Sequence, residues 1–429
     1  MMTRVSQLLL LCFMAPPRPS SAQDSAVVAW IRETAIPLRT LNAGSGFDDL
    51  APLKPVLMNA RIVGLGESTH GTSEFQRAKH RLLEFLVKEM GYTAFAMEAG
   101  YSETQPMNDY VLHGTGNRAD ALSKLGYVAW DMEEFAAMVD WMRAYNRTVP
   151  EASKVRFYGV DIYRNSIGRA KVMAAVRRVL PAAVAPTDSL FRVLAEQERR
   201  WPSWDTTVIA AARAPLDTLA SRLEARRHAA PAVLAPAEWD EIIQLVGVMR
   251  QVAMRKHRDR HMAQNLSYLI DHEQTGTKFV FWAHDDHITA DSPSVGYFLR
   301  QRYADGYYGI GLYFNQGTYL TRALFPLGDF KIQTQPPAVG GMLEWFLARA
   351  GLPRFFLDLR APSGKPSVDS WLHTSREAFA GGWAAENSVG VNDTLKVRDW
   401  YDGLLFVNES TPTHPTPPAR KTVERKEGF

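Results

Sequence analysis

A carboxylate and an imidazole stand three positions apart in a turn of small residues. Glu67 and His70 directly follow the apolar run 62–65. Histidine changes protonation near neutral pH, and a neighbouring carboxylate can fix its tautomer and support its charged form. A helix is expected after the turn, because Ser73 and Gln76 have capping-box spacing before an apolar helical pattern. The pair therefore predicts a general base, and a purely structural cap of the helix is the alternative interpretation.

Further ionisable side chains follow two other strand-like segments. Residues 93–98 form one apolar segment and end in Glu98, and residues 278–283 form another that is followed by His284 and His287. The carboxyl ends of parallel strands meet at one edge of a sheet, where ligands bind in open α/β folds. We therefore expect these side chains to converge with the first pair.

The two later histidines, His284 and His287, have three interpretations. They can orient the substrate and stabilise charge, ligate a metal, or fill structural roles. Two imidazoles with carboxylates suit zinc, manganese or iron, but the chain has no compact H-E-x-x-H motif. It also lacks a G-x-S-x-G elbow and a phosphate-binding glycine motif, which argues against a serine acyl-enzyme and against nucleotide binding. Candidate substrate-binding residues are Arg77, Trp130, Trp282 and Tyr313, and Asp161 ends a further strand-like segment.

Strand-like and helical segments alternate along most of the chain, which predicts an α/β fold with a mainly parallel sheet flanked by helices. No strand pattern occurs between residues 166 and 273, where helical segments are broken by prolines. We interpret this region as a large helical insertion that forms one side of the active-site cleft, with its last helix over 236–272. The expected strands are 61–66, 93–98, 155–160, 278–283, 307–314, 354–359 and 403–407.

The first residues have the layout of a secretory signal peptide. Arg4 precedes a short apolar run over 8–15, and small residues before Gln23 offer a cleavage site. The apolar run is too short to span a bilayer, so we expect a secreted or periplasmic protein without stable membrane insertion. Cleavage would remove the only cysteine, Cys12, and would change the formal net charge from +3 to +1. The expected segments are 1–22 (signal peptide), 23–165 (first part of the α/β core), 166–273 (helical insertion), 274–409 (second part of the core) and 410–429 (flexible tail).

The ordered motifs resemble those of the erythromycin esterase family. They are GLGESTHGT (64–72), AME (96–98), RDRHMAQN (258–265), WAHDDH (282–287) and FVNESTP (406–412). The resemblance spans most of the chain and implies an α/β core that hydrolyses a macrocyclic lactone without a metal. One departure is Asp285, where family members often have asparagine. An additional carboxylate there would raise the pKa of nearby histidines if it points into the site.

The resemblance also implies roles for single residues. His70 would act as the general base on water, with Glu67 and Glu98 orienting it, and His284 and His287 would bind and polarise the substrate. The leading hypothesis is thus an exported hydrolase of a macrolide lactone or related carboxylic ester, acting by direct water attack without a covalent intermediate or cofactor.

Two other hypotheses stay open. A divalent-metal-dependent hydrolase would use the same glutamates and histidines, and a non-catalytic protein would hold iron, haem or a macrocycle. Loss of activity on chelation would favour the metal-dependent hydrolase over the leading hypothesis, and ligand uptake without turnover would identify the non-catalytic binding protein. The near-neutral charge without a clustered basic face argues against nucleic acid, so a small-molecule ester is the expected partner.

Overall fold

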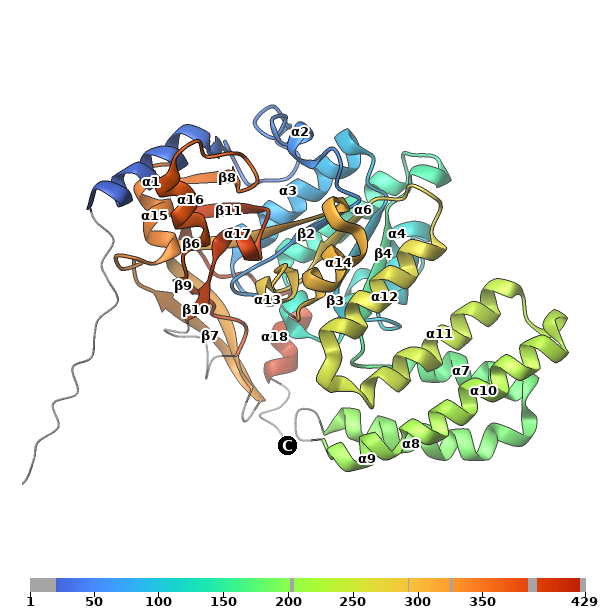
Figure 1. The fold of residues 1–429 in the computed structure, drawn as a ribbon. Coiled ribbons are helices and arrows are strands. Elements are labelled where there is room, and N and C mark those ends of the chain that lie inside the picture. The colour runs from blue at the N-terminus through green and yellow to red at the C-terminus, as the bar shows by residue number, and fades with distance from the viewer. Residues whose placement is uncertain (1–20, 201–203, 292, 325–326, 385–391, 425–429) are drawn as a thin grey trace, which may run out of the picture.

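A mixed sheet runs through the part of the chain that the computed structural model describes, which comprises residues 21–200, 204–291, 293–324, 327–384 and 392–424. The predicted α/β fold with a mostly parallel sheet flanked by helices is confirmed (Figure 1). The nine described strands of this sheet are β1 (Ile36–Pro37), β2 (Ile62–Leu65), β3 (Ala94–Gly100), β4 (Arg156–Asp161), β5 (Phe279–Trp282), β6 (Tyr307–Leu324), β7 (Leu327–Gln335), β8 (Arg354–Asp358) and β11 (Gly403–Ser410).

The strand order explains why the candidate residues can meet. The order is β1-β8-β11-β6-β2-β5-β3-β4, and all neighbours from β11 to β4 are parallel. Strands β2, β5 and β3 are adjacent at the centre, so their carboxyl ends lie at the same edge. A separate hairpin pairs β9 (Arg376–Phe379) with β10 (Asn392–Leu395).

Helices cover both faces of the sheet, because successive residues of a buried strand point to opposite sides. Val63 packs with the helices of one face and Ile62 with those of the other. The first face holds α3 (Ser73–Met90), α4 (Gln105–His113), α5 (Arg118–Leu125) and α6 (Glu133–Asn146). The second holds α12 (Arg258–His272), α13 (Asp285–Ile288) and α14 (Val295–Tyr303). Near β8 lie α1 (Ser21–Thr34), α15 (Leu343–Arg349), α16 (Pro366–His373) and α17 (Val397–Trp400), whereas α2 (Leu53–Leu57) packs with the first face and α18 (Pro417–Glu424) contacts β7.

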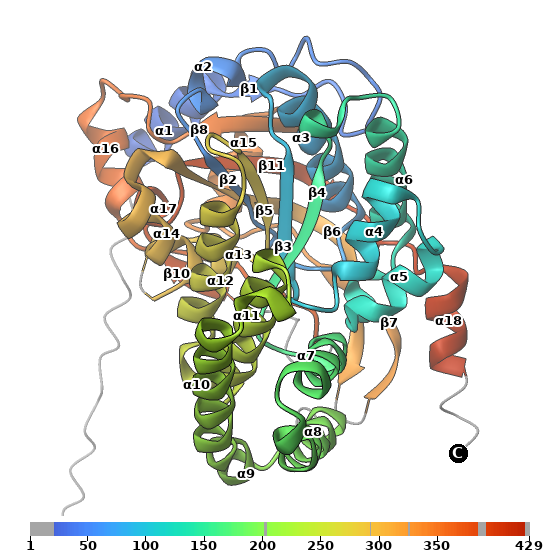
Figure 2. The same ribbon diagram turned by 90° about the vertical axis from the view of Figure 1, so that its right-hand side faces the viewer.

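Five helices between β4 and α12 form a lobe with its own apolar core, and this lobe projects from the sheet at the edge where β3 and β4 end (Figure 2). The prediction of one helix over 236–272 is wrong. The chain leaves the helix at Val252 and begins a new one at Arg258, because α12 packs against β4 and α14 rather than continuing along the lobe. The lobe helices are α7 (Ser166–Val179), α8 (Val184–Arg199), α9 (Thr206–Ala211), α10 (Arg213–Ala229) and α11 (Pro236–Val252).

Two segments differ from the sequence-based expectation. Strand β6 extends well beyond residue 314 and pairs with β7 as a hairpin, which was not predicted because β7 is largely exposed and has little apolar signal. In the region of the expected tail, residues 417–424 form α18, and Thr411 donates two hydrogen bonds to Glu74 on α3, at 2.7 and 2.8 Å.

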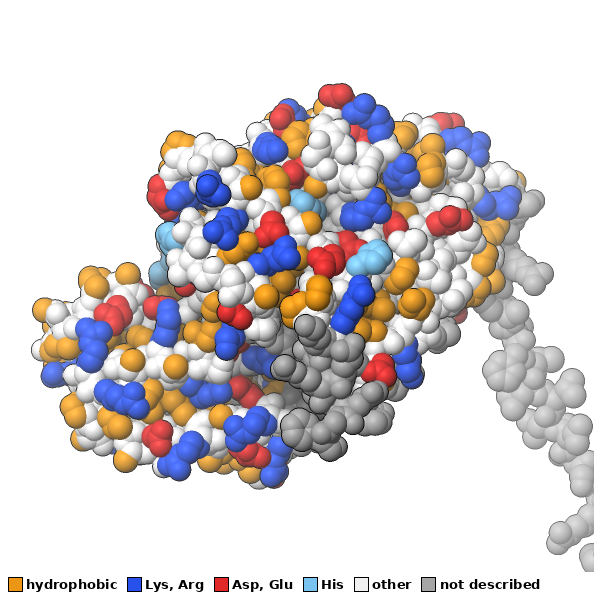
Figure 3. All heavy atoms as spheres, turned by 180° about the vertical axis from the view of Figure 1, so that it is seen from behind, with side chains coloured by type: hydrophobic (Ala, Val, Ile, Leu, Met, Phe, Trp, Pro, Cys, Tyr) orange, Lys and Arg blue, Asp and Glu red, His pale blue; other side chains and the backbone are white. Residues whose placement is uncertain are grey.

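The N-terminal prediction lies mostly outside the described residues. Residues 1–20 of the expected signal peptide are not described, and α1 begins at Ser21. None of the helices in the described ranges combines the length and the hydropathy that crossing a bilayer requires. The face opposite that of Figure 1 shows acidic and basic side chains interleaved over the surface (Figure 3).

Candidate active site

The turn after β2 joins His70 to a fully buried carboxylate. Glu67 Oε1 lies 2.6 Å from His70 Nδ1, and Trp282 Nε1 donates to the same oxygen at 3.1 Å. Burial raises the pKa of Glu67, but the charge of Lys79 and the hydrogen bond with His70 outweigh burial and lower it. An ionised carboxylate can only accept hydrogen bonds, so His70 Nδ1 carries the proton and Nε2 of the neutral ring is free to accept one.

Lys79 is the partner that sequence reasoning missed. Its Nζ lies 2.6 Å from Glu67 Oε2 and 4.1 Å from the centre of the Trp282 ring, and its side chain is fully buried. Burial lowers the pKa of Lys79 to about 8, although Glu67 opposes this shift. A signal was present, because position 79 lies on the apolar face of α3, beside Phe75 and Leu82, where a lysine is unusual.

Backbone hydrogen bonds from distant segments hold the turn in place. Gly66 donates to Ile310 at 2.8 Å, and the nitrogen of His70 donates to the carbonyl of Gly382 at 3.3 Å. Gly71 accepts from Leu320 at 2.9 Å, and a Cβ on Gly71 would lie 1.8 Å from the Leu320 carbonyl oxygen. Only glycine permits this approach, so the position of His70 depends on strand β6 and on the segment after β9.

Glu98 occupies a second buried charge cluster and makes no hydrogen bond to His70. Arg258 at the start of α12 donates to Glu98 at 2.8 Å and to both oxygens of Asp161, at 3.0 and 2.7 Å. Burial raises the pKa of Glu98, but the charges of His287 and Arg258 bring it well below its ordinary value. The expected support of His70 by Glu98 therefore involves no direct hydrogen bond, because the oxygens of Glu98 bind Arg258, His287 and the backbone nitrogen of His284.

His287 lies between two carboxylates. Its Nδ1 is 2.8 Å from Asp259 Oδ2 and its Nε2 is 3.2 Å from Glu98 Oε1. Burial lowers the pKa of His287, but the charge of Glu98 and the bond with Asp259 outweigh burial and raise it to about 10. Arg258 Nη1 also lies 3.0 Å from His287 Nε2, so this nitrogen faces both a guanidinium and the carboxylate of Glu98.

His284 is the second imidazole close to His70, with 5.1 Å between the ring centres. Burial lowers the pKa of His284, but the hydrogen bond and charge of Asp286, with Asp285, raise it to about 9. Its Nε2 is buried and has no hydrogen-bond partner among the described residues. Burial raises the pKa of Asp285 itself to about 8, although the charge of His284 opposes this shift.

A cavity of about 470 Å³ opens over His70. The ring of Trp130 contacts His70 edge-on at 5.2 Å between centres, so Trp130 is the predicted substrate-binding residue that lies in the cavity. The wall is shared by the core, the start of the lobe and the β6 hairpin, and includes Glu98, Tyr127, Tyr163, Arg164, Glu198, Arg258, Arg322 and Trp383.

The other three predicted substrate-binding residues lie elsewhere. Trp282 is fully buried beneath Glu67 and supports the carboxylate instead of lining the cavity. Tyr313 packs in the core near β8, where its hydroxyl meets that of Tyr401 at 3.0 Å. Arg77 is on the outer side of α3, bound to Asn42 at 3.0 Å. Apolar and helical patterns predict burial, but they do not say which face of the core a side chain reaches.

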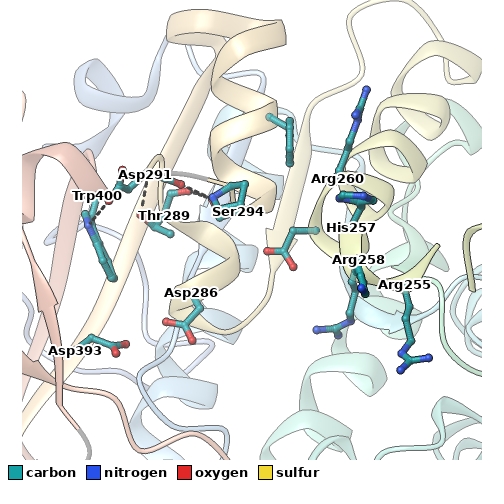
Figure 4. Close-up of a pocket in the computed structure, with 14 residues that line it drawn as sticks. Arg255, His257, Arg258, Arg260, Asp286, Thr289, Asp291, Ser294, Asp393 and Trp400 are labelled. Carbon is teal, nitrogen blue, oxygen red and sulfur yellow. Dashed lines mark hydrogen bonds between the residues drawn. The ribbon is translucent and has the colours of Figure 1, made fainter. Parts of the chain in front are cut away.

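A second cavity, of about 460 Å³, lies on the other side of Arg258 (Figure 4). Arg255, His257 and Arg260 stand on one wall, and Asp286 and Asp393 stand on the wall opposite. Arg258 therefore separates the His70 cavity from a second, strongly charged opening.

The donors of the predicted cluster do not fit a metal site. Within the described ranges, no three His, Cys, Asp or Glu side chains are arranged to hold a metal ion. Glu67 is bound to Lys79 and Glu98 to Arg258, so both carboxylates already have cationic partners.

Comparisons with known proteins identify the family of the chain. The profile of the erythromycin esterase family matches residues 87–410, which include Glu98, Arg258, His284 and His287. The chain is 34% identical to erythromycin esterase type II of Escherichia coli, over 32% of either chain. It is 24% identical to the proposed hydrolase YbfO of Bacillus subtilis (strain 168), over 95% of this chain and 97% of that protein.

Solved structures show the same fold. A protein from Bacillus cereus aligns with a TM-score of 0.78 and 22% identity, over 92% of this chain and 99% of that one. The EreC erythromycin esterase, solved as a mutant in its open conformation, aligns with a TM-score of 0.69 and 18% identity, over 88% of this chain and 98% of that one. Since the family profile covers most of the chain, the protein belongs to the erythromycin esterase family of hydrolases.

Proposed function

We propose that the protein hydrolyses a carboxylic ester or a macrocyclic lactone by direct attack of water, with His70 as the general base. The observation that supports this is the 2.6 Å hydrogen bond from His70 Nδ1 to the buried Glu67, on the wall of a cavity large enough for a substrate. A base positioned in this way contributes about 10²–10⁴-fold to a rate.

In the proposed reaction, His70 Nε2 takes a proton from water as the water oxygen bonds to the ester carbonyl carbon. The carboxylate of Glu67 stabilises the imidazolium that results. The tetrahedral intermediate then collapses, the bond to the alcohol oxygen breaks, and His70 returns its proton to that oxygen. The products are one carboxylic acid and one alcohol, or a hydroxy acid from a lactone.

His284 is suited to stabilise the oxyanion. The pKa of about 9, to which Asp286 raises it against burial, keeps its ring charged at neutral pH, and Nε2 lacks a partner among the described residues. Removal of one oxyanion donor costs about 2.7–4 kcal/mol of transition-state stabilisation. We assign no catalytic step to a metal, because the carboxylates of the cluster already have cationic partners.

The test is mass spectrometry of a panel of macrolides and simple esters incubated with metal-stripped protein. We expect products that have gained one water with the wild type and none with His70→Ala. His373→Ala is the matched control, because His373 also bonds a carboxylate, Asp399, through Nδ1 at 3.1 Å but lies at the surface.

Hydrolysis that persists in His70→Ala would refute the proposed base. Activity that appears only after zinc, manganese or iron is restored to the stripped protein would instead support the metal-dependent alternative.

A further inference from the structure

Arg322 is a buried cation on the wall of the cavity that contains His70. Only 6% of its surface is exposed, its Nε donates to the carbonyl of Gly328 at 2.9 Å, and its guanidinium lies 5.8 Å from the Phe330 ring. Within the described ranges no carboxylate lies within ion-pair distance, and Asp329 acts on it only through longer-range charge. Burying a charge without a counter-charge is costly, so such a residue calls for a function.

The backbone fixes Arg322 beside the catalytic turn. Leu320, two residues earlier on β6, donates to Gly71 at 2.9 Å, and Arg322 itself donates to Trp383 at 3.1 Å. Residues two apart on a strand share a face, so the strand that anchors the His70 turn also places Arg322 on the cavity wall.

Arg164 is a second cation on this wall and has an unusual backbone. Its φ is 61°, in the left-handed region that side chains other than glycine seldom adopt. Its side chain lies across Gly126, where an added Cβ would come within 2.2 Å of Arg164 Cδ. The guanidinium stands 5.3 Å from the Tyr127 ring. Strained conformations of this kind concentrate at functional sites.

The other charges of the cavity wall are already balanced. Glu98 is paired with Arg258, and Glu198 is paired with Arg169 through two bonds of 2.7 and 2.8 Å. Arg199 forms an ion pair within its own helix. The two arginines described above are therefore left without an acid among the described residues, and the cavity carries excess positive charge.

We propose that the cavity selects esters that carry an anionic oxyacid group, a carboxylate or a phosphate, which Arg322 binds with the help of Arg164. The inference rests on the proposed hydrolysis at His70 and names the class of its substrate. Guanidinium groups bind such anions through two parallel hydrogen bonds. The indoles of Trp130 and Trp383 would cover the carbon chain between the anionic group and the ester.

Turnover of two matched esters tests the selection. Monomethyl adipate and methyl hexanoate have acyl chains of equal length, and only the first carries a carboxylate. We expect kcat/KM of the wild type to favour the adipate by about tenfold to a hundredfold, the range of a charge-assisted hydrogen bond. Arg322→Gln should bring the ratio close to one, and Arg322→Lys should keep part of the preference.

The matched control is Arg192→Gln, since Arg192 is exposed on α8, pairs with Asp188 of the same helix and does not line the cavity. Its ratio should equal that of the wild type. A wild-type ratio of one, or a ratio that Arg322→Gln leaves unchanged, would overturn the proposal.

Binding to the His70→Ala protein tests the inference separately from catalysis. Calorimetry would compare monomethyl adipate, monohexyl phosphate and methyl hexanoate. Tighter binding of either anion that is lost with Arg322→Gln supports the proposal, and the tighter of the two identifies the group. Equal binding of methyl hexanoate overturns it. If the anions bind but the wild type hydrolyses no ester, the proposed function is refuted and the anion site is still supported.

Discussion

Replacing Glu67 with glutamine tests whether its charge serves catalysis or only the fold. The substitution keeps the shape of the side chain and removes the charge that faces His70 Nδ1 at 2.6 Å. Charge centres about 4 Å apart interact by about 4 kcal/mol at an effective dielectric constant of about 20. Since about 1.36 kcal/mol changes a rate tenfold, losing this stabilisation of the imidazolium should lower kcat about 10³-fold.

The same substitution also destabilises the fold, because it leaves Lys79 as a buried charge without its partner. Breaking a buried ion pair by removing one member costs about 3–5 kcal/mol. Lys79 is fully buried, and burial already lowers its pKa to about 8 in the presence of Glu67. Lower activity of Glu67→Gln alone could therefore reflect unfolded protein.

A double variant separates the two effects. Glu67→Gln with Lys79→Met removes both charges, so most of the lost unfolding free energy should return while kcat stays about 10³-fold low. Stability is measured by urea unfolding, and activity is measured on an ester that the wild type hydrolyses. Recovery of activity together with stability would refute the catalytic role of Glu67, as would a Glu67→Gln enzyme with normal kcat.

Three further predictions concern stability. Burial lowers the pKa of His287, but neighbouring carboxylates outweigh burial and raise it from 6.5 to about 10. His287 therefore contributes up to about 5 kcal/mol to the free energy of unfolding below pH 6.5, and this contribution is lost as the pH rises to 10. The free energy of unfolding of His287→Asn, measured in urea, should decline less over this interval, and parallel curves for the variant and the wild type would contradict the raised pKa. Truncation after Ser410 should lower the melting temperature, since Thr411 binds α3; an unchanged melting temperature would contradict this contribution. Gly71→Ala should reduce both stability and activity, because the added Cβ would meet the backbone of β6. Gly340→Ala is the control, since Gly340 has open space around it. Equal melting temperatures of the two variants would contradict this reasoning.

The sequence predicted the parts of the site that are local or that follow from strand order. Glu67 and His70 are three residues apart in one turn, and their hydrogen bond follows from that spacing. Glu98, His284 and His287 follow strands that proved to be neighbours, so their convergence followed from the parallel sheet. Strand order did not predict which of these side chains bond to each other. Glu98 binds Arg258, 160 positions away, instead of His70.

The wall of the cavity was predicted less well, for a physical reason. Trp282 and Tyr313 are as apolar as Trp130, and all three are buried, but only Trp130 reaches the cavity. Arg322 lies on the β6 hairpin, whose exposed strand β7 carries little apolar periodicity. Contacts between distant segments decide these positions, and a single sequence contains no direct record of them.

The water-activating residues and the residues of the cavity wall are held by different parts of the fold. His70 and Glu67 are held by central strands and by fully buried partners, so few substitutions there are compatible with either the fold or the reaction. Arg164 lies in the connection that precedes the lobe, and Arg322 lies near the end of β6 beside the exposed strand β7, where a side chain can change without removing a partner of Glu67. Exchanging these wall residues should therefore alter which ester is accepted while leaving the water-activating pair in place.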